Sequence, residues 1–403
     1  MVAEEVRYEP VSVKAVLAEM KDTAELLIDL SYSAVLGDSD ALAEEVLELE
    51  ARMDLLQMQG RMSVLLAARN PEDAEALAPV LGVIAAAEKV SNAAGDIAKI
   101  VLEEIGMPAA IRGGLHDATE TVIRTRAAAG APAVGVPLGT SHLETETGVR
   151  VIAIRRESAV QKQQWLLNPG AATTVEADDV LLLRGQDAGL TAAVAAVGEA
   201  GFTPPGRPDG SVPDLERAVD SIVLMKDMSE LAVDLAYGAV LFDSQPVAEE
   251  VSELEVEMDA LKSRLEAWAL RAAAAVEEPV ELRGLFHLAA ATEVISDAAL
   301  EIAEGVLRGI DAHPVVAAAV QESDEVIIRA AVGGSATLAG RSLGEKAVQT
   351  ETGMRVIAVR RSAGWVVQPD ATTTVAAGDV LIAKGTRAGA ERLRALVDHP
   401  GGS

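Results

Sequence analysis

The sequence repeats itself along almost its whole length, and this internal duplication constrains the fold more than any other feature. When the 403-residue chain is shifted by 205 residues, Met20–Gln59 matches Met225–Arg264 at 23 of 40 positions. The same shift aligns Thr145–Gly148 with Thr350–Gly353, and a five-residue deletion after Arg361 changes the offset to 200. We therefore predict two copies of one structural unit, packed together as an intrachain pseudo-dimer.

Within each copy, a helical periodicity gives way to short strands. Apolar residues recur every three or four positions over Leu42–Leu56, and similar seams run through about Val13–Leu36 and Val83–Ile105. We therefore predict an antiparallel bundle of three helices, with breaks near Gly37 and at Asn70-Pro71. Beyond Pro108, β-branched runs between turn residues predict strands, and a closing helix follows them. The strands are predicted at Glu120–Arg124, Arg150–Ile154, Trp165–Leu167 and Asp179–Leu183, and the helix at about Asp187–Ala200.

The predicted fold class is therefore α+β multidomain: a three-helix bundle followed by a small α+β domain, with this whole unit duplicated. Between the copies, Phe202–Pro213 holds four prolines and two glycines, a composition that ends helices and is typical of a semi-rigid linker. The predicted domains are a bundle at 11–108, an α+β domain at 113–200, the linker at 201–213, a second bundle at 214–310 and a second α+β domain at 316–398.

Composition excludes several functional classes. With 34 basic and 63 acidic residues the formal net charge is −29, which disfavours nucleic-acid binding because phosphates need a basic surface. The absence of cysteine excludes disulfides and thiolate metal sites. No apolar run approaches the length of a membrane span, and the N-terminus has no secretion signal, so we expect a cytoplasmic protein. The acidic excess, with 25 arginines but 9 lysines, is typical of a halophilic protein.

The α+β half carries a spaced motif that resembles the TrkA-C domain, the C-terminal domain of regulators of potassium conductance. In the second copy the motif runs through Leu338–Leu343, Thr352–Arg361, Val367–Pro369 and Thr374–Leu381 to Gly385. The first copy repeats it from Pro137 to Gly185. TrkA-C domains commonly follow a Rossmann domain, but the chain has no G-x-G-x-x-G after a strand, so we expect no dinucleotide sensing of that kind.

The helical half resembles one three-helix bundle of the PhoU family. The residues that carry this resemblance are Ala43–Val46 leading to Asp54, Glu88–Ala98, and the second-copy counterpart Glu293–Ala303. Together the two resemblances cover roughly residues 11–200 and 212–398. They imply a regulator of a cation channel or transporter, with potassium as the expected ion.

Arginines cluster at the ends of one apolar strand in each copy, and they are the candidate ligand-binding residues. In an acidic chain such arginines can hold an anion through forked hydrogen bonds, or they can pair with nearby carboxylates on the surface. The TrkA-C resemblance implies a small ligand between paired domains, cyclic di-AMP or another nucleotide. The six arginines are Arg150, Arg155, Arg156, Arg355, Arg360 and Arg361.

Carboxylates four residues apart on the helices are candidate ligands for a divalent metal. Such spacing places like charges on one helix face, where a hard cation can neutralise them, and PhoU bundles carry metal clusters on E-x-x-x-D motifs. The alternative is a hydrated acidic face. The metal candidates are Glu50, Asp54, Glu88, Asp96, Glu255, Asp259, Glu293, Asp297 and Glu301, and the same spacing occurs at Glu25/Asp29 and Glu230/Asp234.

No catalytic constellation is recognisable, because none of the five histidines has a histidine at its repeat-equivalent position. We predict that the protein is not an enzyme. The favoured function is a cytoplasmic regulatory subunit that acts beside a membrane channel or transporter, with further homo-oligomerisation left open. The alternatives are a PhoU-like metal-binding scaffold or phosphate-signalling adaptor, and a regulator of a divalent-cation transporter.

Overall fold

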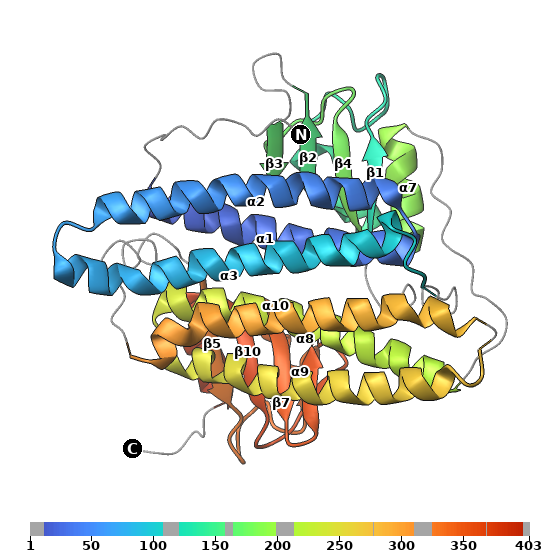
Figure 1. Cartoon of the computed structure of the whole chain (residues 1–403). Helices are drawn as coiled ribbons and strands as arrows, with labels where there is room; N and C mark the ends of the chain where they lie inside the picture. The colour runs from blue at the N-terminus through green and yellow to red at the C-terminus, as the bar shows by residue number, and fades with distance from the viewer. Residues whose placement is uncertain are drawn as a thin grey trace.

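The computed structural model describes residues 12–107, 121–157, 164–198, 213–276, 278–309, 325–367 and 369–397. The predicted linker at 201–213 lies outside these residues, except for Pro213 at the start of a helix. Long helices cross the middle of the molecule in Figure 1, with one β-sheet emerging at the top of the view and the other at the bottom. The duplicated α+β architecture predicted from the sequence is confirmed.

The first bundle consists of three helices whose starts are fixed by side-chain caps. Ser12 Oγ accepts a hydrogen bond from the Ala15 amide at 3.1 Å, and Asn70 Oδ1 accepts one from the Asp73 amide at 2.8 Å. These caps satisfy amides that have no partner within the helix. The helices are α1 (Val13–Gly37), α2 (Asp40–Ala67) and α3 (Pro71–Leu102). The second bundle repeats them as α8 (Pro213–Phe242), α9 (Gln245–Ala272) and α10 (Arg283–Leu307), with the short 3-10 helix η1 (Pro279–Leu282) before α10.

The third helix is longer than its apolar seam indicated. Its seam begins at about Val83, but α3 itself begins at Pro71, at the predicted break, and continues through Pro79. Proline at the first helical position costs nothing, because its missing N–H would have no partner there. Pro79 in turn packs against α10, where a Cβ added to Gly305 would lie 2.7 Å from the Pro79 Cβ. The glycine therefore permits the close approach of α3 and α10.

Each bundle is followed by a four-stranded antiparallel sheet. The first sheet has the strand order β1-β4-β2-β3 and the second β5-β10-β7-β8, which is the same order in repeat-equivalent strands. The strands of the first sheet are β1 (Thr121–Arg126), β2 (Arg150–Arg156), β3 (Gln164–Leu167) and β4 (Val180–Gly185), with helices α5 (Leu138–Ser141), α6 (Leu143–Thr147) and α7 (Asp187–Val197). The second unit has β5 (Glu325–Ala331), β6 (Arg341–Ser342), β7 (Met354–Arg361), β8 (Gly364–Val367), β9 (Thr374–Val375) and β10 (Val380–Thr386), with α12 (Val348–Thr352) and α13 (Arg387–Val397).

The alternation of side chains along each strand places the sheet between two apolar layers. On β4, Leu182 belongs to the core shared with the helices, whereas its neighbours Leu181 and Leu183 pack beneath α7. On β10, Ile382 and Leu381 divide in the same way between the shared core and the layer beneath α13. One face of each sheet is therefore fixed to a helical bundle.

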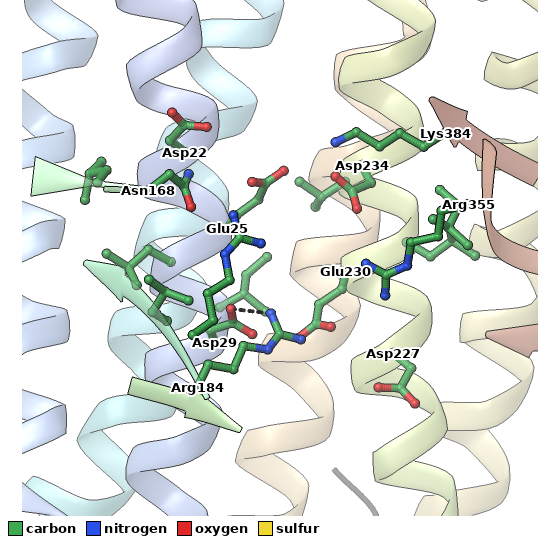
Figure 2. Close-up of a pocket in the computed structure, with 18 of the residues that line it drawn as sticks. Asp22, Glu25, Asp29, Asn168, Arg184, Asp227, Glu230, Asp234, Arg355 and Lys384 are labelled. Atoms are coloured by element: carbon green, nitrogen blue, oxygen red, sulfur yellow. Dashed lines mark hydrogen bonds and ion pairs between the residues drawn. The ribbon is translucent and has the colours of Figure 1, made fainter. Parts of the chain in front are cut away.

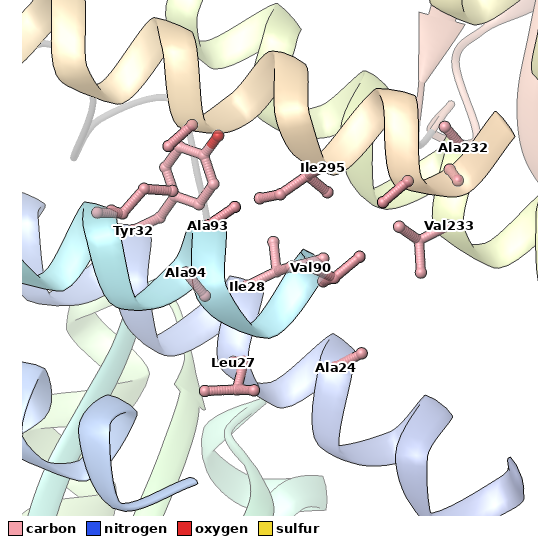
Figure 3. Packing of buried hydrophobic residues seen from close by; sticks show 14 of the residues in the cluster. Ala24, Leu27, Ile28, Tyr32, Val90, Ala93, Ala94, Ala232, Val233 and Ile295 are labelled. Atoms are coloured by element: carbon pink, nitrogen blue, oxygen red, sulfur yellow. The ribbon is translucent and has the colours of Figure 1, made fainter. Parts of the chain in front are cut away.

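The two halves share one continuous apolar core, because α3 and α10 pack directly against each other. Figure 3 shows Ala93 of α3 between Tyr32 of α1 and Ile295 of α10. Backbone contacts extend this interface: the Gly284 amide donates to the Gly106 carbonyl at 2.9 Å. The twin halves thus pack as pseudo-symmetric mates.

Among the described residues, no helix is long and apolar enough to cross a membrane.

Candidate functional site

A cavity of about 700 Å³ lies at the boundary between the two halves, and it is lined by both copies of the repeat. Helices α1 and α8 form facing walls, and strands of the two sheets supply the flanks (Figure 2). Most lining residues occur with their repeat-equivalent mates, so the cavity is pseudo-symmetric. Both halves are therefore needed to build it.

The walls formed by the helices are acidic. Asp22, Glu25 and Asp29 are spaced three and four residues apart, which places them on one face of α1. Their mates on α8 are Asp227, Glu230 and Asp234, and all six carboxyl groups line the cavity. Figure 2 shows Glu25 and Asp29 extending from α1 toward Asp234 and Glu230 of α8.

The flanks formed by the sheets are basic. In the first sheet Arg150 begins β2 and Arg184 lies on β4; the mates in the second sheet are Arg355 on β7 and Lys384 on β10. Arg184 Nη1 donates to Asp29 Oδ2 at 2.9 Å, which ties the first sheet to α1. In the part of the chain that the structure describes, Arg150 and Arg355 form no ion pair, and both are exposed to the cavity.

Two carboxyl pairs face each other across the boundary between the repeats. Glu25 lies within hydrogen-bonding reach of Asp234, and Asp29 within reach of Glu230. These pairs are repeat-equivalent, because residues 25 and 29 correspond to residues 230 and 234. Lysines flank both pairs: Lys21 forms an ion pair with Glu25 and lies 4.0 Å from Asp234, and Lys226 lies 2.5 Å from Glu230.

Burial and like charge together raise the pKa values of these acids. Burial raises the pKa of Glu25 to about 8, with Asp234 adding to the shift and Lys21 opposing it. Burial also raises the pKa of Asp29 to about 6; here Glu230 adds to the shift and Arg184 opposes it. The pKa of Asp227 rises to about 6 through burial, against the attraction of Lys226. Near neutral pH the cavity therefore holds protons on some of its carboxyl groups.

The six predicted ligand-binding arginines fall into three repeat-equivalent pairs in the structure. Arg150 and Arg355 line the cavity, as described above. Arg155 and Arg360 instead bind buried glutamates of the bundles: Arg155 Nη2 lies 2.6 Å from Glu45, and Arg360 Nε lies 3.3 Å from Glu250. Each glutamate binds a second arginine of the same sheet as well, Arg124 at 2.8 Å and Arg329 at 2.5 Å, respectively.

Arg156 and Arg361 are held within their own α+β domains. Arg156 donates to both carboxylate oxygens of Asp179, at 2.8 and 2.7 Å, and to the Thr174 carbonyl. Arg361 donates to Asp379 and to the Thr374 carbonyl, and Asp379 is the repeat mate of Asp179. These two arginines, like Arg155 and Arg360, form structural ion pairs and do not line the cavity.

The predicted metal-binding carboxylates lie on α2–α3 and α9–α10, away from the cavity. In the first bundle Glu50 and Asp54 lie on α2 and Glu88 and Asp96 on α3; burial raises the pKa of Glu50, and Asp54 and Asp96 contribute. Several of the carboxylates have basic partners: Arg61 lies 3.6 Å from Glu88, and Lys99 lies 2.7 Å from Asp96.

The second acidic set is denser. Glu255 and Asp259 lie on α9, while Glu293, Asp297 and Glu301 lie on α10. Burial raises the pKa of Asp297, with Glu293, Asp259 and Glu301 contributing. Lys262 pairs with Glu293, and Lys89 of the other bundle pairs with Glu301. Within the described ranges, no group of three or more acidic or histidine side chains has the geometry to hold a metal ion.

Several cavity residues were not among the sequence candidates, namely Asp22, Asp227, Arg184 and Lys384. Glu25/Asp29 and Glu230/Asp234 were recognised as spaced carboxylates, but nothing in one copy alone showed that they face each other. The available signal was the duplication, which retains Lys, Asp, Glu and Asp at the same positions of α1 and α8.

Comparison with known families agrees with this architecture. A TrkA-C domain model matches residues 122–198 and 325–398, and a PhoU domain model matches residues 17–101 and 222–306. No curated protein matches the chain.

Solved structures were compared as well. PhoU from Pseudomonas aeruginosa is 13% identical with a TM-score of 0.41, covering 74% of this chain and 96% of that one. The GsuK RCK domain is 15% identical with a TM-score of 0.17, covering 72% and 70%. The GsuK channel bound to NAD is 16% identical with a TM-score of 0.18, covering 69% of this chain and 53% of that one, so the chain spans about half of the channel's length. On the evidence of the family models, the chain carries two PhoU domains and two TrkA-C domains in alternation and is a tandem PhoU–TrkA-C protein.

Proposed function

We propose that the protein is a cytoplasmic regulatory subunit of a cation channel or transporter, with potassium as the expected ion. The observation that carries the proposal is the cavity at the boundary of the repeats, which is lined by repeat-equivalent charged residues from both halves. The presence of two TrkA-C domains supports it, since this domain type occurs in regulators of potassium conductance. The protein acts by binding, not by catalysis.

Regulation requires a ligand that binds one arrangement of the two halves more tightly than another. A ligand in this cavity would contact α1 and α8 together with both sheets, so its binding energy depends on how the halves are placed. Arg150 and Arg355 are the arginines available to a small anionic ligand such as cyclic di-AMP, because the other four candidates are held in internal ion pairs. The TrkA-C domains would pass the change to the membrane partner.

The test is made in a strain that lacks the gene. Rubidium uptake, as a tracer for potassium, is measured in that strain complemented with the natural chain or with Arg150→Ala/Arg355→Ala. We expect altered uptake in the deletion strain, restoration by the natural chain and no restoration by the double variant. Arg341→Ala, which removes an exposed arginine outside the cavity, should restore uptake. Unchanged rubidium and sodium uptake in the deletion strain would refute the proposal.

A second function, a PhoU-like metal scaffold or phosphate-signalling adaptor, is favoured by the two PhoU domains of the chain. The mutual repulsion of the acidic carboxylates on α9 and α10 raises the pKa values of Glu255 and Asp297, after the effect of burial, and a divalent cation would relieve that repulsion. Phosphate accumulation in the same deletion strain, and calorimetric titration of the pure chain with Mn²⁺ or Mg²⁺, test this alternative. Changed phosphate content with normal cation uptake would favour it.

A further inference from the structure

In each of the two carboxyl pairs, an acid on α1 of the first repeat faces an acid on α8 of the second repeat. Glu25 reaches across to Asp234, and Asp29 reaches across to Glu230. Two facing carboxyl groups in a partly buried site hydrogen-bond only when one of them carries a proton, because two carboxylates have no donor between them. The two carboxyl groups of a pair therefore form a stable contact when one of them carries a proton, and they repel each other when both are ionised.

The surroundings of the pairs decide how strong that repulsion is. Lys21 and Lys226 flank the pairs on their own helices, and Arg184 is bound to Asp29. The other charged groups that line the cavity are the acids Asp22, Asp227 and Glu144 and the bases Arg150, Arg355 and Lys384. Two tyrosine hydroxyls, those of Tyr32 and Tyr237, are buried close to the same acids. The cavity lining thus has seven acidic and four basic residues. When the two flanking lysines are counted with the basic residues, the acidic residues outnumber them by one.

We propose that Glu25/Asp234 and Asp29/Glu230 form a proton-binding site shared by the two repeats, in which one proton in each pair holds α1 against α8. Loss of these protons leaves carboxylates facing each other across the boundary and widens the cavity. The raised pKa values of Glu25 and Asp29, about 8 and about 6, place the change between slightly acidic and slightly alkaline pH. The biological meaning of this proton site rests on the proposed regulatory function, but its physical test does not.

The widening would be passed to the TrkA-C domains through contacts already described. Asp29 is bound to Arg184 of β4, so the first sheet moves with α1. The second sheet is attached to its bundle through Arg329 and Arg360 on Glu250. A change in the spacing of α1 and α8 therefore changes the spacing of the two sheets.

The test uses distance measurement on the full chain, which has no cysteine of its own. Ala195→Cys and Ala395→Cys place spin labels at repeat-equivalent, exposed positions of α7 and α13. Pulsed electron paramagnetic resonance then gives the distance between the labels from pH 5.5 to pH 9. We expect the mean distance to lengthen as pH rises, by about 2 Å, a typical helix displacement at an interface.

Neutral variants identify the groups responsible. Glu25→Gln/Glu230→Gln and, independently, Asp29→Asn/Asp234→Asn each remove one carboxyl group from both pairs and should abolish the pH response. Asp220→Asn removes an exposed acid elsewhere on α8 and should retain it. Circular dichroism confirms the folding of each variant. Because there are two independent double variants, the test remains possible if one of them does not fold.

A distance that does not change with pH in the parent chain, or a full response that persists in both double variants, would overturn the proposal. Because the measurement uses the pure chain alone, such a result would leave the cation-uptake test of the proposed function unaffected. Conversely, unchanged cation uptake in cells would leave the distance change standing.

Discussion

The Tyr32 hydroxyl on α1 is hydrogen-bonded to Thr292 Oγ1 on α10, so a buried polar contact joins the first helix of one bundle to the third helix of the other. Thr292 also donates to the Leu288 carbonyl at 2.7 Å, which leaves its oxygen to accept from the tyrosine. The repeat-equivalent contact is missing, because Thr292 corresponds to Ala87. The buried Tyr237 hydroxyl has no hydrogen-bond partner among the described residues.

This asymmetry predicts different results for one substitution made at two equivalent positions. Tyr32→Phe removes a buried hydrogen bond and should lower the free energy of unfolding by about 1 kcal/mol. Tyr237→Phe removes an unsatisfied buried hydroxyl and should leave stability unchanged or raise it. Urea unfolding of both variants measures the two values. Equal destabilisation by both substitutions would show that Tyr237 has a partner.

Ala87→Thr should supply the partner that Tyr237 lacks. The new hydroxyl would accept the hydrogen bond, which contributes about 1 kcal/mol, against about 0.5 kcal/mol for the lower helix propensity of threonine. A double-mutant cycle with Tyr237→Phe separates the new bond from any packing strain at the buried position. We expect a coupling energy of about 1 kcal/mol between residues 87 and 237. A coupling energy near zero would mean that the two side chains do not meet.

Much of the fold was predictable because duplication and periodicity are local properties of the sequence. The apolar seam over Leu42–Leu56 fixed the buried face of α2, and the short runs at Arg150–Ile154 and Asp179–Leu183 located β2 and β4. The break at Asn70-Pro71 located the start of α3, although its apolar seam begins only near Val83, because the stretch from Pro71 to Leu81 buries few residues besides Leu77 and Val80. A seam shows where a helix is buried, which is not always where it begins.

The candidate site was less predictable, because its geometry depends on contacts between distant residues. Arg155 and Arg150 lie on the same strand, yet one binds Glu45 on α2 and the other lines the cavity. The ion-pair partner of each arginine depends on how the sheet packs against the bundle, and this packing cannot be predicted from a local sequence pattern. Likewise, Glu25 meets Asp234 only because the two halves pack about a pseudo-two-fold axis.

The buried Glu45 should be essential to the docking of the first sheet on its bundle. Its carboxylate binds Arg124 and Arg155, and only 3% of its side chain is exposed. Glu45→Gln removes the buried counter-charge of both arginines and leaves Arg155 only the exposed Glu48 at 3.9 Å, so we expect a loss of unfolding free energy of about 2–4 kcal/mol, somewhat reduced by the partial exposure of Arg124. Chemical denaturation measures the loss, and limited proteolysis shows whether the TrkA-C domain is released first.

The matched control is Glu253→Gln. Glu253 also pairs with an arginine of a sheet, Arg360, but 55% of its side chain is exposed. Water screens such a pair, so we expect a change within about 0.5 kcal/mol. If Glu45→Gln were as mild as this control, the buried ion pairs would not be what holds the sheet in place.

The raised pKa of Glu25 predicts that the folded chain loses stability as pH rises toward 8. An unfolded glutamate releases its proton near pH 4.5, whereas Glu25 in the folded chain retains it up to about pH 8. Between these values the folded state binds more protons than the unfolded state, so the free energy of unfolding falls with rising pH and levels off above about pH 8. Asp29 and Asp227, with pKa values of about 6, add to the fall between about pH 4 and pH 6.

Urea midpoints measured between pH 6 and pH 9 isolate the contribution of Glu25 above about pH 7, because Asp29 and Asp227, half titrated at pH 6, have lost most of their protons by then. Glu25→Gln cannot lose a proton in this range and should flatten the curve between pH 6 and pH 8. Asp220→Asn, which removes an exposed acid on α8, should leave the slope as it is in the natural chain. A slope that Glu25→Gln does not change would mean that Glu25 is already ionised at pH 6, and that the pair with Asp234 holds no proton in the physiological range.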